Sequence, residues 1–388
     1  ACAIFSPAPT CRWCRSPSRK KATSCATTSA IFYPRSVRIS CKARKLLPRL
    51  PAASRHCASR APAPVLRQSR WFRSITEYLD NCQNNSHLLR RMTTDLAGGW
   101  LEHGHITQED FDYITKKLTY PLSMIDKITP HPDERVCAML QEDGLSGMEI
   151  FTTSKSTVAA AYVNSERPQH LLIENDFPNG HPAFEQLGVI LTSRSIVEKS
   201  ARMKACTCMN PMDTALGVFG CMLGYTRISD EMKDTELVNL ITRLSEQEAM
   251  PMVADPGVID PEAFLHEVLG ERYPNPFLQD SPQRTATDTS RKIAPRFGTT
   301  LYAYYNSMLP AHRATRLIYI PLVLAGWLRY LEGVDDNGSE FTLSPDANIE
   351  HVRALMGNPK LGDDVSEAQL YPLLANRYYF GVNLFEIG

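Results

Sequence analysis

The first 76 residues of this 388-residue chain contain no acidic residue and no glycine, although they hold 16 lysine and arginine residues. The first acidic residue is Glu77 and the first glycine is Gly98. The remaining 312 residues hold 26 basic and 42 acidic side chains, so the formal net charge of zero conceals two oppositely charged parts. This asymmetry excludes a single uniform domain. The absence of glycine also excludes a glycine-rich phosphate-binding loop from residues 1–76.

Residues 1–76 are rich in serine, arginine, alanine, proline and cysteine, and their weak hydrophobic periodicity predicts a largely disordered segment. Three interpretations stay open. An arginine- and serine-rich leader without acids is typical of an organelle transit peptide. A basic arm binds nucleic acid or anionic lipid through its charge. The third is a translation in the wrong reading frame, which the missing initiator methionine and the abrupt change of composition favour slightly.

The chain also lacks an apolar run long enough to cross a bilayer. The most apolar stretch, LIYIPLVLAGWL at 317–328, is too short and is interrupted by Pro321. We expect it to form a buried helix that starts near this proline, because proline is well tolerated in the first turn of a helix.

Metal-binding patterns are scarce as well. Cys11 and Cys14 have the C-x-x-C spacing that suits zinc or a redox pair, but no second pair lies nearby, so we expect no metal site. The five cysteines of the remaining chain lie in apolar or helical contexts and indicate reduced core residues of a cytoplasmic protein. Organelle import is the alternative if residues 1–76 are a transit peptide. These five are Cys82, Cys137, Cys206, Cys208 and Cys221.

From Glu77 onward the sequence has regular hydrophobic periodicity. Helical spacing recurs at 86–104, 107–118 and 132–144. Four short runs rich in apolar and β-branched residues then predict strands, namely MEIFTTS, TVAAAYVN, QHLLIEN and GVILTS. After about residue 195 the patterns are almost wholly helical: 196–208, 212–226, 230–246, 261–272, 298–307, 312–333, 348–357 and 366–375. The predicted fold is therefore a mixed α/β part followed by an all-α part.

The stretch SARMKACTCMNPMDTALGVFG places an amine, an amide and a carboxylate in what looks like a buried helix. The structural interpretation makes Lys204 a solvated surface residue, Asn210 a helix cap before Pro211, and Asp213 an acid of the first turn. The functional interpretation makes the three residues part of an active site.

Three separated motifs favour the functional interpretation. YPLSMIDKITP (120–130), RMKACTCMNPMDTALGVFGCMLGY (202–225) and NPFLQDSPQRTATDTSRKIAPRFG (275–298) together resemble the mannitol dehydrogenase family. This family comprises polyol-specific, long-chain, metal-independent dehydrogenases and includes hexuronate reductases. The resemblance covers about residues 80–388.

The resemblance implies a Rossmann-like domain followed by a multi-helical domain, with substrate between them. We therefore expect residues 77–197 to be an apparently incomplete, remnant Rossmann-like domain and residues 198–388 to be the helical C-terminal domain. The family's glycine-rich phosphate loop has no counterpart that we find in the sequence, which leaves NAD binding open.

The resemblance also assigns site residues. Lys204 corresponds to the catalytic lysine, and Asn210 and Asn81 correspond to two asparagines that bind the reacting oxygen. A lysine can exchange a proton there without a metal if burial lowers its pKa, and two amides can stabilise the developing negative charge. Without the resemblance, Asn81 reads as part of a turn.

Further positions match the substrate side of the cleft. Arg284 and Lys292 correspond to basic residues that hold the far end of the substrate, although each also fits a solvated loop. Asp126 corresponds to an acid that lines the cleft, and we assign it weakly to the cofactor side. Asp213 stands in a substrate-binding position where the family has a histidine. An ionised aspartate accepts hydrogen bonds but donates none, so for Asp213 we favour the structural interpretation.

The resemblance predicts an NAD-dependent, metal-independent oxidoreductase that acts on a small-molecule sugar alcohol or sugar acid, with fructuronate and D-mannonate as the first pair. The alternatives are a mannitol 2-dehydrogenase, or a truncated or degenerate member without cofactor binding or activity. Nucleic-acid binding rests on the charge of residues 1–76 alone and is not favoured, because aromatic residues for base stacking are sparse. We expect no membrane partner, and the oligomeric state stays open, with a monomer as one of the options.

Overall fold

The structure is a computed structural model that describes residues 84–127, 130–154, 157–163, 165–166, 169–278, 280–308 and 313–387. The segment 1–76, the Cys11–Cys14 pair and Asn81 lie outside these residues. The chain divides into two compact units, the first ending at Asp126 and resuming over His170–Arg194. The second unit comprises Lys127–Gln169 and the chain from Ser195 onward. Residues 127–169 thus group with the helical part in this division, and the domain bounds 77–197 and 198–388 stay a prediction.

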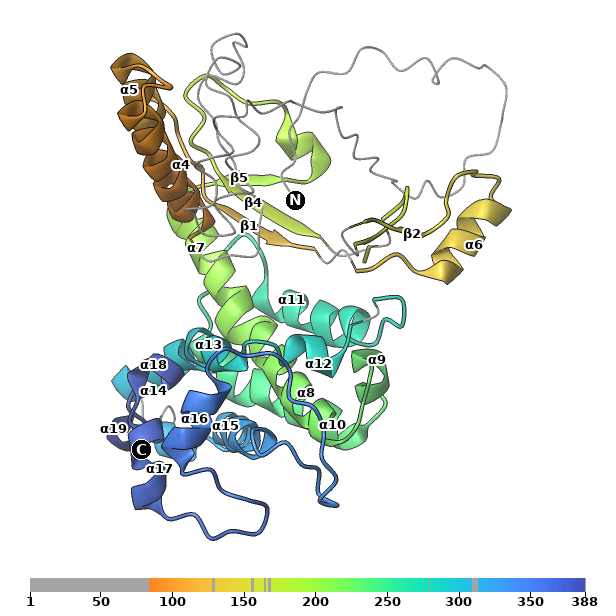
Figure 1. Cartoon of the computed structure of the whole chain (residues 1–388), viewed down its shortest axis with the longest axis vertical. Helices are drawn as coiled ribbons and strands as arrows, with labels where there is room; N and C mark the ends of the chain where they lie inside the picture. The colour runs from red at the N-terminus through yellow and green to blue at the C-terminus, as the bar shows by residue number, and fades with distance from the viewer. Residues whose placement is uncertain are drawn as a thin grey trace. The chain divides into compact units, whose positions relative to one another are not determined.

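The first unit begins with two packed helices, α4 (Asn85–Glu102) and α5 (Gln108–Lys116), which Figure 1 shows side by side. A capping box starts α5, because the Thr107 side chain accepts from the N–H of Asp110 and the Asp110 side chain accepts from the N–H of Thr107. Their shared core consists of Leu89, Ala97, Ile114, Leu118 and Tyr120.

A three-stranded sheet completes this unit, in the order β1 (Ser123–Asp126), β4 (His170–Glu174), β5 (Ile190–Thr192). β4 pairs antiparallel with β1 and parallel with β5. A short 3₁₀ helix, η3 (Phe184–Leu187), precedes β5. The strands expected at QHLLIEN and GVILTS are confirmed. β1 was not predicted, because its four residues follow Pro121 and are too few to show an alternating pattern.

The part of the second unit that precedes residue 170 contains α6 (Glu134–Glu142) and a small antiparallel pair, β2 (Phe151–Thr152) with β3 (Val158–Ala159). Asp133 caps α6 by accepting a hydrogen bond from the N–H of Arg135. The helix predicted at 132–144 and the strands predicted at MEIFTTS and TVAAAYVN are confirmed, the strands as two-residue pairs.

The rest of the second unit is helical, so the predicted order of a mixed α/β part and an all-α part is confirmed. Its elements are α7 (Arg194–Met203), η4 (Lys204–Cys208), α8 (Asn210–Met222), α9 (Ile228–Glu231), α10 (Thr235–Arg243), η5 (Leu244–Ala249), η6 (Met250–Met252), α11 (Pro261–Glu267), η7 (Val268–Arg272), α12 (Pro282–Thr285), α13 (Thr289–Ile293), η8 (Ala294–Gly298), α14 (Thr299–Asn306), η10 (Ala314–Arg316), α15 (Tyr319–Tyr330), α16 (Ile349–Met356), α17 (Glu367–Leu374), α18 (Arg377–Phe380) and α19 (Leu384–Ile387). Of these, η4, η5, η7 and η8 are π-helical turns.

α8 lies at the centre of this unit and contacts α12, α15 and α10 (Figure 1). Its side chains Met212, Ala215, Leu216 and Val218 are all 0% exposed. Fully burying a large apolar side chain contributes about 1.5–3 kcal/mol relative to leaving it exposed, so this helix anchors the helical core. No helix among the residues that the structure describes is both long and apolar enough to cross a membrane.

Close backbone contact joins η8 to the end of α18. A Cβ atom added at Gly298 would lie 2.5 Å from the carbonyl oxygen of Phe380 and 2.9 Å from the Cα of Gly381. Both atoms belong to the backbone, so neither can move aside as a flexible side chain would. Glycine at 298 therefore lets the two segments touch.

We predict that Gly298→Ala lowers the free energy of unfolding by about 1–3 kcal/mol, because the backbone of α18 must shift to admit the methyl group. Gly270→Ala is the matched control, since it also lies in a π-helical turn but its Cβ would meet no atom within 4 Å. Urea unfolding of both variants measures the difference. Equal stability of the two variants would contradict the packing described at Gly298.

Candidate active site

The segment between η4 and α8 carries the two residues expected at the reacting oxygen. Lys204 begins η4 and is only 6% exposed, so the surface location considered for it is wrong. The N–H of Met209 donates to the carbonyl oxygen of Lys204 at 3.2 Å, which is the i to i−5 spacing of a π-helix. Asn210 then opens α8. The cap position belongs to Met209, so the capping role considered for Asn210 is also wrong.

Arg296 of η8 makes two hydrogen bonds to the first turn of α8. Its Nη1 atom donates to the carbonyl oxygen of Asn210 at 3.1 Å and to the hydroxyl oxygen of Thr214 at 2.8 Å. Burial lowers the pKa of Arg296, while the neighbouring carboxyl of Asp213 opposes that change. The side chain of Arg296 thereby fixes the helix turn that carries Asn210.

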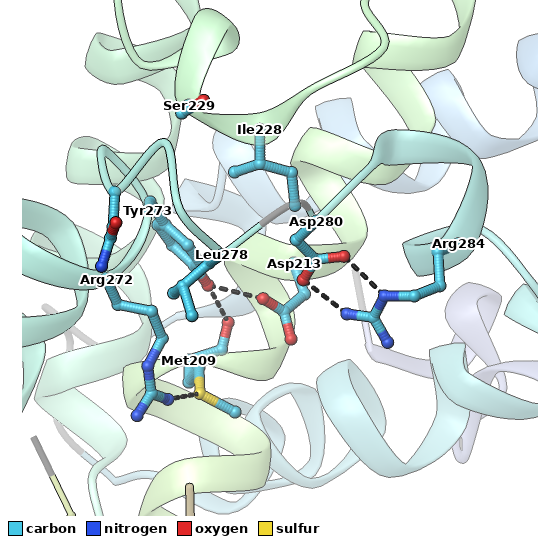
Figure 2. A pocket seen from close by; sticks show the side chains of 10 residues that line it. Met209, Asp213, Ile228, Ser229, Arg272, Tyr273, Leu278, Asp280 and Arg284 are labelled. Carbon is cyan, nitrogen blue, oxygen red and sulfur yellow. Dashed lines mark hydrogen bonds and ion pairs between the residues drawn. The ribbon is translucent and has the colours of Figure 1, made fainter. Parts of the chain in front are cut away.

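A pocket opens beside this turn, within the second unit (Figure 2). Two of the predicted site residues, Asp213 and Arg284, lie in its wall. The lining residues are Met209, Asp213, Ile228, Ser229, Arg272, Tyr273, Asn275, Leu278, Asp280 and Arg284.

Asp213 and Tyr273 meet in the wall of the pocket. The Tyr273 hydroxyl oxygen lies 2.8 Å from Oδ1 of Asp213 and 3.0 Å from the carbonyl oxygen of Met209, as Figure 2 shows. Burial raises the pKa of Asp213, although the positive charge of Arg296 and the bond to Tyr273 act against it. Burial and the adjacent Asp213 keep the pKa of Tyr273 well above its usual range.

Arg284 lies on α12 at the opposite side of the pocket and is paired with Asp280. Its Nε and Nη2 atoms each lie 2.5 Å from one carboxylate oxygen of Asp280, a bidentate arrangement, and its side chain is 64% exposed. Lys292 on α13 donates to the carbonyl oxygen of Thr285 at 3.0 Å. Burial, followed by repulsion from Arg296, lowers the pKa of Lys292 to about 8.

A buried ion pair supports the other side of the pocket. Arg272 at the end of η7 donates from Nε to Oε2 of Glu166 at 2.7 Å and from Nη2 to Oε1 at 3.1 Å. Both side chains are no more than 3% exposed. Because a buried charge is costly without its partner, this pair fixes the end of η7 and with it Tyr273, the next residue.

The remaining two predicted site residues are Asp126 and Asn81. Asp126 ends β1 in the first unit and is 1% exposed. Asn81 lies outside the described residues. Among the residues that are described, no group of three or more histidine, cysteine, aspartate or glutamate side chains is arranged to hold a metal ion.

Sequence reasoning missed several residues of the pocket. Asp280 and Arg296 both lie in the quoted stretch 275–298, and the i, i+4 spacing of Asp280 and Arg284, which spans the start of α12, was a usable signal. Arg272 and Tyr273 belong to no motif that we recognised. Their pairing with residues 60 or more positions away carries no local sequence signal.

The short helix α9 carries a fully buried acid. Glu231 of α9 is 0% exposed, and among the described residues neither carboxyl oxygen has a hydrogen-bond partner. Its carboxyl group lies where a Cβ atom of Gly220 would be, at 2.2 Å from Oε1, so glycine is required there. Burial, helped by repulsion from Asp280, raises the pKa of Glu231 to about 9.

Comparison with solved structures defines the class of fold. The chain aligns with Pseudomonas fluorescens mannitol 2-dehydrogenase, solved as a ternary complex with NAD and D-mannitol, at a TM-score of 0.57 and 25% identity, covering 80% of this chain and 57% of that one. It also aligns with a D-sorbitol dehydrogenase in substrate-free form at a TM-score of 0.58 and 19% identity, covering 80% and 55%. The fold is therefore that of sugar-alcohol dehydrogenases.

The sequence comparisons give the family. The model of the mannitol dehydrogenase C-terminal domain matches residues 197–380. A D-mannonate oxidoreductase of Thermotoga maritima is 47% identical over 313 residues, which are 80% of this chain and 58% of that protein. A mannitol 2-dehydrogenase of Pyrenophora tritici-repentis is 26% identical over 78% of this chain and 47% of its own length. The chain is a member of the mannitol dehydrogenase family, as predicted, and spans about half the length of these relatives.

We predict that Glu231→Gln stabilises the protein more at alkaline than at acidic pH. Between pH values near the ordinary glutamate pKa and about 9, the unfolded chain has lost a proton that the folded chain retains, so the wild type loses stability as pH rises. Glutamine has no proton to lose and keeps the side-chain shape. Thermal unfolding at pH 5 and pH 9 measures the effect, with the exposed Glu236→Gln as control. A stability difference that does not change with pH would show Glu231 to be ionised.

Proposed function

We propose that the chain is an NAD-dependent, metal-independent oxidoreductase that interconverts a keto-uronate and its alcohol, with fructuronate and D-mannonate as the first candidate pair. The observation that carries this proposal is the 47% identity with a D-mannonate oxidoreductase over four-fifths of the chain. The complex of the Pseudomonas fluorescens relative with NAD supports the choice of cofactor. A cytoplasmic location stays a prediction.

In this proposal Lys204 is the general acid of carbonyl reduction and the general base of alcohol oxidation. Its burial at the start of η4 supports the role, because a general acid or base acts on a substrate that is shielded from bulk water. The side chain of Asn210, six residues along the chain, would donate to the reacting oxygen, and Asn81 would do the same. The cofactor supplies or accepts the hydride. The carboxyl of Asp126 is too buried for an open contact with a dinucleotide, so we do not assign Asp126 to the cofactor.

Two cationic side chains, Arg284 and Lys292, are evidence that the substrate is an anion. Arg284 is exposed at the pocket, and guanidinium groups bind carboxylates in bidentate fashion. Lys292 adds a second positive charge, and its pKa of about 8 means that a fraction of these amines is neutral near neutral pH. A uronate carboxylate would compete with Asp280 for Arg284. A mannitol 2-dehydrogenase activity is the second candidate, favoured by the mannitol-bound relative, and an inactive family member is the third.

We predict that the purified chain consumes NADH with fructuronate, and less with tagaturonate or fructose, and that Lys204→Ala lowers kcat by about 10²–10⁴-fold, the usual contribution of a positioned acid or base. The control is Lys199→Ala, because Lys199 is an exposed lysine on the preceding helix α7. Its kcat should equal that of the wild type.

Three results would decide among the candidates. Turnover of fructose but not of the uronates would favour the mannitol 2-dehydrogenase. Absence of NADH consumption with all three sugars would favour an inactive chain. Equal activity of the Lys204 and Lys199 variants would remove Lys204 from the reaction.

A further inference from the structure

The hydroxyl group of Tyr273 has two oxygen neighbours, one from Asp213 and one from Met209, but only one proton. A tyrosine hydroxyl group carries one proton and donates one hydrogen bond. Here its oxygen lies 3.0 Å from the carbonyl oxygen of Met209 and 2.8 Å from Oδ1 of Asp213. A carbonyl oxygen has no proton, and an ionised carboxylate has none either. One proton shared between the two acceptors would give two weak, three-centre bonds, whereas two full hydrogen bonds require that Asp213 carries a proton and donates it to the tyrosine oxygen.

We propose that Asp213 is protonated in the working site and that Tyr273 is a positioning residue, which accepts a hydrogen bond from Asp213 and donates one to Met209, so that the pair holds the turn between Lys204 and Asn210 in place. The kinetic part of this inference rests on the proposed function, whereas its structural part does not.

Met209 is the residue through which this pair acts. Its N–H donates to the carbonyl oxygen of Lys204 at 3.2 Å, and its own carbonyl oxygen accepts from the N–H of Asp213 at 3.1 Å as well as from Tyr273. The carbonyl group has two lone pairs, and these two donors use both. Met209 therefore joins the lysine turn to the first turn of α8, and Tyr273 fixes it from η7.

The groups around Asp213 affect its pKa in both directions. Burial is the main cause that raises its pKa, and Asp280 adds repulsion, whereas Arg296, Arg272 and the Tyr273 bond act in the opposite direction. Two of the neighbouring cations are paired with other acids, Arg272 with Glu166 and Arg284 with Asp280, whereas Arg296 donates to neutral oxygens of Asn210 and Thr214 and keeps its charge. Lys292 also interacts with Asp213, and part of its own charge is lost near neutral pH.

A protonated Asp213 has a consequence for the substrate. An ionised aspartate beside Asp280 would repel a uronate, but a neutral carboxyl group presents only a polar surface to the pocket. It also restores a hydrogen-bond donor at the position where the family has a histidine. In the proposal this proton is donated to Tyr273, so the carboxyl group has no proton left to donate to a substrate.

The protonation state is tested directly by infrared difference spectroscopy of the wild type against Asp213→Asn across a pH series. We expect a carboxylic-acid carbonyl band at neutral pH in the wild type that is absent from the variant and disappears as pH rises. A carboxylate signal for Asp213 from mildly acidic pH upward would overturn the proposal. This measurement needs no catalytic activity, so it decides the proposal even if the proposed function fails.

The positioning role is tested by kcat at saturating substrate in the direction of alcohol oxidation. There Lys204 must be deprotonated, so its titration limits only the acidic side of the profile. We expect Tyr273→Phe to lower kcat about tenfold, the effect of one lost hydrogen bond. Asp213→Asn carries an amide that also donates but does not titrate, so its kcat should not show the decline at alkaline pH that we expect of the wild type.

Tyr225→Phe is the matched control, since Tyr225 donates to Asp234 at 2.9 Å in another aspartate–tyrosine pair that does not involve Met209. Its kcat should be unchanged. An unchanged kcat in Tyr273→Phe, or the same alkaline decline in Asp213→Asn and the wild type, would overturn the positioning role.

Discussion

The constraint on which this structure depends is that α8 is both the centre of a helical core and the carrier of polar site residues. Its body is sealed by side chains without exposed area, such as Met212 and Leu216. Polar groups at its first turn are therefore withdrawn from water and need partners inside the protein. The carbonyl of Asn210 binds Arg296, and the carboxyl of Asp213 meets Tyr273. The same bonds that stabilise the buried turn also fix the geometry of the site.

Several residues at or near the site lie in π-helical turns. Lys204 begins η4, Arg272 ends η7, and Arg296 lies in η8. In η4 and η7 the i to i−5 bond is made by the N–H groups of Met209 and Tyr273. A π-helical turn holds an extra residue relative to an α-helical turn, which redirects the side chains at the end of a helix, and such turns are frequent at functional sites. The convergence of three of them around the start of α8 supports an active site here.

Much of the fold could be predicted from the sequence, because its signals are local. Apolar periodicity and capping residues such as Thr107 indicated most helices, and β-branched runs indicated four strands. The elements between 282 and 297 were missed because α12 and α13 are too short to show a period. For the candidate site, the motifs pointed to Lys204, Asn210 and Arg284, whose roles stay predictions. Arg272 and Tyr273 owe their place to contacts across sixty or more residues, which no local pattern records. The protonation of Asp213 depends on burial in the folded chain.

The claim that Lys204 exchanges the proton of the reacting alcohol is tested most directly by chemical rescue of Lys204→Ala with small primary amines. The account predicts that activity with fructuronate, lost in the variant, returns in proportion to the concentration of the free amine and follows its pKa across a series of amines. The wild type should not respond. A variant that keeps full activity without amine, or one that binds substrate normally and gains nothing from any amine, would contradict the account.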